Sequence, residues 1–277
     1  TSNFLNNTMM SSVSYSKTFP SSPSVNLSVS ASHSQNTNTK SIDMTLPSLR
    51  GSVERIYPFA KEGETKKGLI KSLNLQYSMQ ADNRFATYDS LFFSKKMFNE
   101  ARNGVQHSIP ISTTAKLMKY ITLGLNSSIN ETWQFKTIRK NNFNSTIGKV
   151  GIDTLSGFDR FMTYNLGASL GTTIYCTFRF KKGSAIRHVM RPSVSYGYTP
   201  SFDQYYDYYI SDAYGNRMQY SRFEGGIYGT PGLHESQSIG FSLANTFEAK
   251  MKQKDSAETA PRKVMLLNSL NFSSNYN

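Results

Sequence analysis

The sequence predicts an all-β fold: an antiparallel transmembrane β-barrel, of which this chain supplies a part. Three observations predict it. Apolar and polar residues alternate with a period of two along most of the chain, as in strands with two different faces. Many runs are near ten residues long; transmembrane strands need about 9–11 residues, whereas ordinary strands average about 5–6. The polar positions carry mostly Ser, Asn, Gln, Gly and Thr, which suit the wall of a wide, water-filled barrel.

The alternating runs give about eleven strands. In the run that begins at Val25, for example, Val25, Leu27 and Val29 alternate with Asn and Ser residues. The alternation is weaker in the runs that begin at Met9, Ile42, Val105 and Tyr220. In chain order the runs are Met9–Phe19, Val25–Ala31, Ile42–Leu46, Leu73–Ala81, Val105–Ile111, Ile121–Ile129, Tyr164–Leu170, Val194–Tyr198, Tyr220–Tyr228, Ile239–Phe247 and Leu270–Tyr276.

The connections between the runs support a barrel, because membrane barrels have short turns at one end and longer loops at the other. We expect short links near 20–23, 117–119, 181–185 and 230–235, and long ones near 83–103, 136–157 and 200–219. The charged segment 57–67 fits less well, since by parity it should be a short turn. Aromatic residues near strand ends are candidates for an interfacial girdle: Tyr15, Phe19, Trp133, Phe135, Tyr175, Tyr196 and Tyr198.

Composition excludes several other classes of protein. Aromatic residues make up 13% of the chain, which argues against disorder. One cysteine, Cys176, excludes an intrachain disulfide framework, and no window of 18 apolar residues predicts a transmembrane helix. A soluble β-sandwich is the alternative fold, although its wet face would carry more Lys and Glu. The chain begins at Thr1 and stops within an alternating run, so we expect an internal fragment or a mature chain without its ends, with a complete domain as the alternative.

The sequence contains no pattern typical of a catalytic, cofactor-binding or metal site. The four histidines are scattered, and His107 and His188 lie in phase with apolar residues, which favours a structural role. The glycine-rich stretch 225–229 lacks the strand–helix context of a dinucleotide site and indicates a bulged or closely approached strand. We therefore expect neither an enzyme nor a cofactor.

The net charge of +13 favours a negatively charged class of partner. Basic residues do not cluster on one element as in nucleic-acid-binding proteins, so we expect no nucleic acid. Arg187 and Arg191 share a face with Ser193 and Ser195 and are candidate lumen-facing residues that would attract the phosphate groups of an anionic glycolipid. The alternative is a set of solvated charges near a turn.

Three prolines, Pro47, Pro110 and Pro192, interrupt strand-like runs. Proline has no backbone N–H to donate to the ladder, so each is a candidate strand-weakening position. We expect bulges or strand ends at these positions.

Several stretches resemble one protein family. The run RHVMRPSVSYGYTPSF at 187–202 resembles the lipopolysaccharide-assembly barrel proteins of the LptD family, in the form found in Bacteroidetes-type bacteria. Further stretches of similar character occur in order along the chain: Phe19–Gln35, Leu46–Leu49, Arg55–Phe59, Ala101–Ser112, Phe223–Gly229 and Ser238–Lys250.

This resemblance implies a function. It implies an outer-membrane barrel of about 26 strands that inserts lipopolysaccharide into the outer leaflet of a Gram-negative outer membrane. The implied partners are lipopolysaccharide, outer-membrane lipid, an LptE-like plug lipoprotein and the periplasmic transport-bridge proteins. Residues 1–277 would be part of one barrel domain, without the N-terminal periplasmic domain and the remaining strands. In this family prolines weaken pairing at a lateral seam and disulfides assist maturation, which Cys176 alone cannot supply.

The sequence is also compatible with other functions. The chain fits another outer-membrane barrel, a porin or a receptor-type transporter, or a secreted β-rich binding or adhesion domain. Separately, Ser90, Thr154 and Ser256 each follow an aspartate in an Asp-Ser/Thr-apolar tripeptide that resembles the Bacteroidetes O-glycosylation signal. All three are expected in loops.

Overall fold

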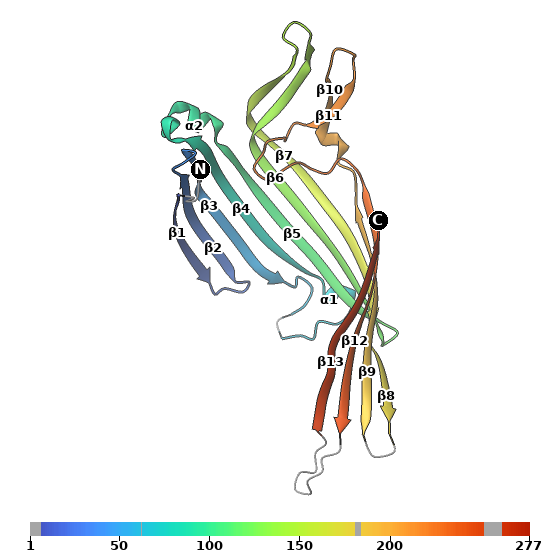
Figure 1. The fold of residues 1–277 in the computed structure, drawn as a ribbon. Helices are drawn as coiled ribbons and strands as arrows, with labels where there is room; N and C mark the ends of the chain where they lie inside the picture. Colours follow the sequence, from blue (N-terminus) through green and yellow to red (C-terminus); the bar gives the residue numbers. More distant parts are fainter. Residues whose placement is uncertain (1–6, 62, 181–183, 252–261) are drawn as a thin grey trace, which may run out of the picture.

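The computed structural model describes residues 7–61, 63–180, 184–251 and 262–277. Most of them belong to one antiparallel sheet (Figure 1). Neighbours in the sheet follow the order β1-β2-β3-β4-β5-β6-β7-β9-β12-β13, with β8 paired to β9. The strands are β1 (Thr8–Phe19), β2 (Val25–Asn36), β3 (Ser41–Ile56), β4 (Asn74–Tyr88), β5 (Arg102–Leu117), β6 (Ile121–Asn144), β7 (Lys149–Thr172), β8 (Ile174–Arg179), β9 (Ala185–Thr199), β12 (Ser236–Met251) and β13 (Arg262–Tyr276).

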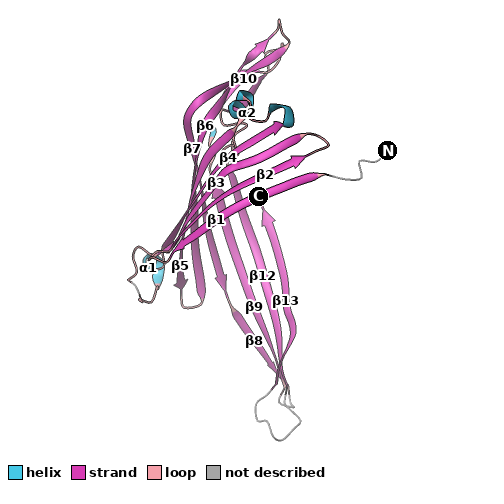
Figure 2. Ribbon diagram, turned by 90° about the vertical axis from the view of Figure 1, so that its left-hand side faces the viewer, coloured by secondary structure: helices cyan, strands magenta, loops and turns pink. Residues whose placement is uncertain are grey.

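The sheet is curved and open, with β1 and β13 at its two edges (Figures 1 and 2). A separate two-stranded ribbon, β10 (Tyr206–Ile210) and β11 (Arg217–Ser221), stands at its upper end. Helical structure is limited to α1 (Gly68–Lys71), α2 (Lys95–Glu100) and the 3-10 turns η1 (Asp89–Leu91) and η2 (Asp203–Tyr205) in the described residues. None of these helices is long and apolar enough to cross a membrane.

The register of the sheet collects the polar side chains on one face, which we call the inner face. Directly paired residues share a face, and Ser193 pairs with both Ser242 of β12 and Gly171 of β7. The same correspondence continues from strand to strand across the whole sheet. It places on this face, among others, Ser16, Ser28, Arg50, Gln80, Gln106, Thr132, Asn165, Ser195 and Gly240.

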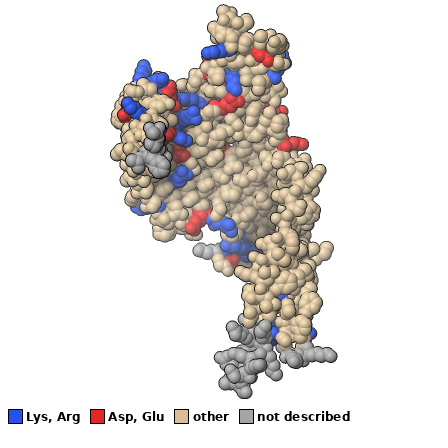
Figure 3. All heavy atoms as spheres, viewed as in Figure 1, with Lys and Arg blue, Asp and Glu red and all other residues tan. Residues whose placement is uncertain are grey.

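The opposite face, which we call the outer face, is apolar and largely uncovered. Many large side chains on it are more than one third exposed, for example Val194 at 43% and Phe241 at 54%. A water-soluble sheet would bury such a surface, so its exposure indicates a face built to contact lipid. In the view of Figure 3, charged side chains lie in the upper part of the molecule and in a further group near the middle of the picture, while the surface of β12 and β13 is mostly uncharged.

Ten of the eleven predicted runs lie on strands of the main sheet, which confirms the all-β antiparallel prediction. The run Tyr220–Tyr228 is wrong beyond Ser221, because residues 222–229 form successive turns with positive φ at Gly225 and Gly229. The strands β8 and β10 were not predicted from the sequence.

The predicted connections are partly confirmed. Links at 20–24 and 118–120 are short, and 89–101 is long and contains α2. Segment 136–157 is not a loop: β6 and β7 continue through it to a turn at 145–148. Residues 230–235 are not a separate short link but the end of the connection from β9 to β12, which also contains β10 and β11. The link from β3 to β4, residues 57–73, remains long, although it lies at the same end of the sheet as the short links 20–24 and 118–120.

Candidate functional site

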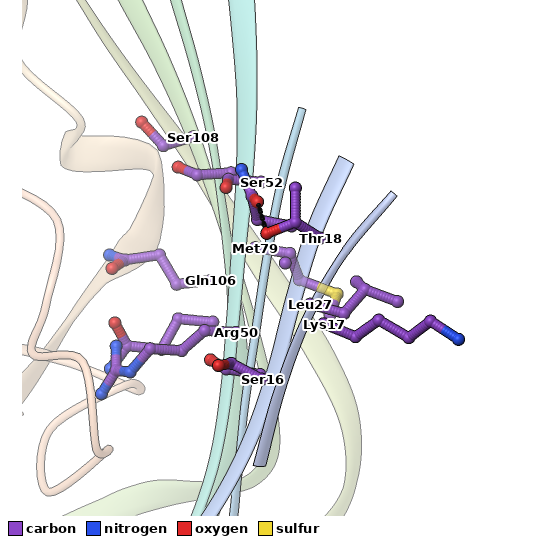
Figure 4. A pocket seen from close by; sticks show the side chains of 14 residues that line it. Ser16, Lys17, Thr18, Leu27, Arg50, Ser52, Met79, Gln106 and Ser108 are labelled. Carbon is purple, nitrogen blue, oxygen red and sulfur yellow. Dashed lines mark hydrogen bonds between the residues drawn. The ribbon is translucent and has the colours of Figure 1, made fainter. Parts of the chain in front are cut away.

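The inner face of β1–β5 forms a shallow pocket of about 340 Å³. Its polar lining includes Ser16, Arg50, Gln106 and Ser108. Figure 4 shows these side chains pointing to one side of the sheet, while Lys17 points to the other side. Hydroxyl and amide groups around a single guanidinium are suited to a hydroxylated or phosphorylated solute rather than to an apolar one.

Part of the long connection after β9 folds back onto this inner face. We call residues 222–229 the crossing segment. Near its end, the Tyr228 hydroxyl lies 3.1 Å from Asp82 Oδ2 and 3.2 Å from the carbonyl oxygen of Gln80, both on β4. The Gln80 side-chain amide donates to the same Asp82 oxygen at 2.6 Å. A second hollow, of about 610 Å³, lies between Tyr228 and the inner face of β1–β4.

Two glycines allow the crossing segment to lie close to the wall. A Cβ at Gly226 would stand 2.0 Å from Gln134 Nε2, and Gln134 is only 1% exposed. A Cβ at Gly104 of β5 would stand 2.9 Å from the Trp133 carbonyl oxygen and 3.0 Å from the Ile227 side chain. Since only glycine lacks a Cβ, these positions are where the crossing segment and the wall can approach closely. The sequence-based expectation of a closely approached backbone at 225–229 is therefore confirmed, although the segment is not a strand.

The start of the crossing segment is anchored by charge and by aromatic packing. Arg222 Nε donates to Asp159 Oδ2 at 2.6 Å, and Lys140 Nζ lies 2.6 Å from Glu224 Oε2. Phe223 is fully buried, with its ring 4.8 Å from that of Phe161. The segment is thus fixed at both ends and lies across the inner face.

Tyr228 is held in its protonated form. Burial, and then the nearby negative charge of Asp82, raise the pKa of Tyr228 above its ordinary value. The phenol therefore remains a hydrogen-bond donor toward β4 throughout the physiological pH range.

Tyr228→Phe is expected to weaken the anchoring of the crossing segment by about 1 kcal/mol, the usual net value of one hydrogen bond. Backbone amides of residues 223–229 should then exchange with solvent about fivefold faster, measured by hydrogen–deuterium exchange mass spectrometry. Tyr214→Phe is the matched control, because Tyr214 is 93% exposed. Identical exchange in the two variants would contradict this anchoring role.

Arg187 and Arg191 lie on the inner face of β9, paired with Glu248 and Ala244 of β12. The Arg187 guanidinium stacks 4.7 Å from the centre of the Tyr175 ring, and its Nη1 is 3.9 Å from Glu248 Oε2. Arg191 Nη1 is 3.5 Å from Thr246 Oγ1. The structure does not bring them to the pocket around Arg50, because that pocket belongs to β1–β5.

The three prolines lie within interior strands. Pro47 falls in a bulge of β3, between Thr45 and Ser48, where the register shifts against β2 and β4. Pro110 stands in the middle of β5 in regular register with β6, so the expected bulge or strand end is absent there.

Pro192 lies inside β9, paired on one side with Leu243 of β12. On its other side the partner of β9 changes, from β8 up to Met190 to β7 from Ser193 onward. The missing N–H therefore falls between two ladders, where no hydrogen bond is required of it.

The remaining residues singled out from the sequence are the histidines and the three candidate O-glycosylation positions. His107 Nδ1 is 2.7 Å from the Tyr77 hydroxyl, and the His188 ring stacks 4.1 Å from that of Phe247. Ser90 lies in η1, but Thr154 lies within β7 rather than in a loop. Ser256 lies outside the described residues. Within the described ranges, no three His, Cys, Asp or Glu residues are grouped as metal ligands.

Sequence reasoning missed Arg50, Asp82 and Tyr228. A signal existed for two of them: Arg50 is in phase with Ser48 and Ser52, and Asp82 continues the polar phase of β4. No local signal marks Tyr228, because its partner is 146 residues away in the chain.

Comparison with known proteins gives one match. A family model described as "LptD protein" matches residues 1–277. No curated protein and no solved structure matches the chain significantly.

Proposed function

Because the chain belongs to the LptD family over its whole length, we propose that it forms part of the wall of an outer-membrane translocon that inserts lipopolysaccharide into the outer leaflet. The family acts in lipopolysaccharide transport and assembly at the outer membrane, and it is not a family of enzymes.

The observation that carries the proposal is the separation of a mostly polar face from a mostly apolar face in one sheet. Lipopolysaccharide joins a hydrophilic saccharide to an apolar acyl region, and a conduit for it needs an aqueous wall beside a lipid-contacting one. The neutral polar inner face and the exposed apolar outer face provide these two environments. Arg50, Arg187 and Arg191 add cations to the inner face, and we assign them contacts with lipopolysaccharide phosphates.

We further propose that residues 1–277 belong to one barrel domain closed by additional strands. Every residue of β1 is exposed, and a strand edge of this kind leaves a row of backbone groups without partners. In the hydrocarbon region such groups must be paired, since lipid offers no hydrogen bonds. An LptE-like plug lipoprotein, a periplasmic domain and the transport-bridge proteins complete the proposed assembly.

Photocrosslinking in living cells tests the translocon proposal at two adjacent residues. Ser242 lies on the inner face, 2.6 Å from Ser193 Oγ, and Phe241 lies on the outer face. A photoreactive amino acid replaces each in turn in the full-length protein, and adducts are probed for lipopolysaccharide. We expect an adduct at Ser242 that disappears when delivery through the transport bridge is stopped.

The adduct at Phe241 is expected to persist, because that residue contacts resident membrane lipid. Equal, bridge-independent labelling at the two positions would overturn the translocon proposal, since it would mean only residence beside lipid. Recovery of an unlabelled protein in the soluble fraction would overturn the barrel itself.

A further inference from the structure

The segment between β4 and β5 is placed on the outer face by its own helix. Met97 of α2 is 3% exposed and packs in a cluster with Phe85, Ala101 and Met44. Phe85 and Met44 are paired across β4 and β3, in phase with outer-face residues. The helix therefore covers the apolar side of the sheet at its upper end, as seen for α2 in Figure 1.

This position leaves large aromatic side chains uncovered next to the lipid-contacting wall. Phe93 is 72% exposed and Phe98 51%, while Phe92 is 38% exposed with its ring 4.4 Å from that of Phe93. Phe93 also has a φ of +57°, a backbone conformation that is rare and unfavourable for a bulky residue. The fold thus holds Phe93 in an unfavourable backbone conformation and leaves the adjoining rings of Phe92 and Phe93 exposed.

The same height of the sheet carries other aromatic residues on the outer face. The Trp133 and Phe158 rings are 5.7 Å apart, and Phe135 and Phe158 are 6.0 Å apart. Lys136, the residue after Phe135, donates from Nζ to the Ala101 carbonyl oxygen at 2.7 Å and so ties β6 to the end of α2. The aromatic residues of the segment therefore continue a belt of the kind that lies at a membrane–water boundary.

The segment also supplies positive charge at this level. Lys95 and Lys96 directly follow the exposed phenylalanines and Ser94, and both are exposed. Lys96 lies 3.9 Å from Glu100 in a solvent-exposed pair of little energetic weight, so its ammonium group remains accessible. Aromatic rings with adjacent ammonium groups match the two layers of a leaflet, acyl chains below and phosphates above.

We propose that residues 92–98 are an interfacial anchor that inserts into the outer leaflet. Phe92, Phe93 and Phe98 enter between the lipid headgroups, and Lys95 and Lys96 contact phosphate groups of the lipopolysaccharide that forms this leaflet. The occupant is the lipid leaflet and not a protein, because the segment is continuous with the lipid-contacting outer face. It is the outer leaflet, because the longer connections of a membrane barrel lie on its extracellular side, and this end carries the long connections 89–101 and 200–235. This anchor rests on the proposed outer-membrane location, and it fixes the height of the sheet in the membrane, a role separate from transport.

Photocrosslinking of the full-length protein in living cells tests the anchor with three probe positions. A probe at Phe93 is expected to form lipopolysaccharide adducts that persist when the transport bridge is stopped, because they arise from resident lipid. A probe at Tyr214, 93% exposed between β10 and β11, is expected to form at least fivefold fewer. The probe at Phe241 reports that the barrel is inserted.

A charge-reversal variant distinguishes binding of lipid phosphates by Lys95 and Lys96 from mere proximity of the segment to lipid. Lys95→Glu with Lys96→Glu is expected to lower the lipopolysaccharide adduct at Phe93 at least threefold and leave that at Phe241 unchanged. Lys116→Glu, near the other end of β5, is the control. Labelling at Phe241 with no lipid adduct at Phe93, or a Phe93 adduct to protein alone, would overturn the anchor. The bridge-dependent result at Ser242 tests the translocon independently.

Discussion

Val194→Arg is expected to destabilise the membrane-inserted sheet by about 2–4 kcal/mol, the cost of an arginine on the lipid face near the bilayer midplane. Val194 lies on the outer face of β9, between Leu170 of β7 and Phe241 of β12. All three side chains are more than 40% exposed, so an arginine there would meet lipid rather than protein.

The neighbouring substitution is the control. Ser195→Arg puts the same side chain on the exposed inner face, where water solvates it, and is expected to cost less than about 1 kcal/mol. Reversible urea unfolding of the full-length protein in lipid vesicles measures both values. Equal losses of stability at the two positions would contradict the assignment of the faces.

Gly226→Val is expected to displace the crossing segment from the inner face. A Cβ there would stand 2.0 Å from Gln134 Nε2 and 2.4 Å from Gln134 Cδ, and this buried side chain has little room to move. Overpacking of this kind typically costs about 1–3 kcal/mol. Amide exchange of residues 223–229 should therefore rise by about tenfold or more, and ion conductance through the assembled barrel should increase.

Gly232→Val is the control that tests whether a valine anywhere in this connection would raise amide exchange and conductance. Gly232 is in the same connection, has no neighbouring atom within 4 Å of the position that a Cβ would take, and has no positive φ. The substitution is therefore expected to leave exchange and conductance unchanged. A Gly226→Val protein with wild-type protection of the crossing segment would show that the segment does not depend on close approach to Gln134.

The sequence predicts the membrane-spanning part of the sheet well and the part beyond the membrane poorly. Runs such as Ile121–Ile129 alternate because one face meets lipid and the other meets water. Above the lipid, both faces of β6 and β7 are wet, so residues 136–144 have no apolar phase and resemble a loop. There the strands are held by pairing, for instance Arg139 with Asp153, and not by burial.

The crossing segment shows a second limit of sequence patterns. Phe223, Ile227 and Tyr228 resemble residues of a weak strand, yet each is set by a partner far away in the chain. Phe223 packs on Phe161, and Tyr228 reaches β4. Alternation reports which face of a regular strand is wet; it contains no information on which irregular segment folds back onto that face.

The bulge at Pro47 shifts by one position the alternation of inner-face and outer-face residues along β3. Between Thr45 and Ser48, two residues of β3 stand opposite one residue of β2 and one of β4. Met44 before the bulge and Leu49 after it are therefore both on the outer face, although one is even-numbered and the other odd. Deletion of one residue within the bulge would leave the inner-face and outer-face residues of β3 on their faces both before and after the bulge. Deletion of one residue from the regular part of a strand would move every later side chain of that strand to the opposite face. Insertions or deletions of an even number of residues keep each side chain on its own face, and those of an odd number do not.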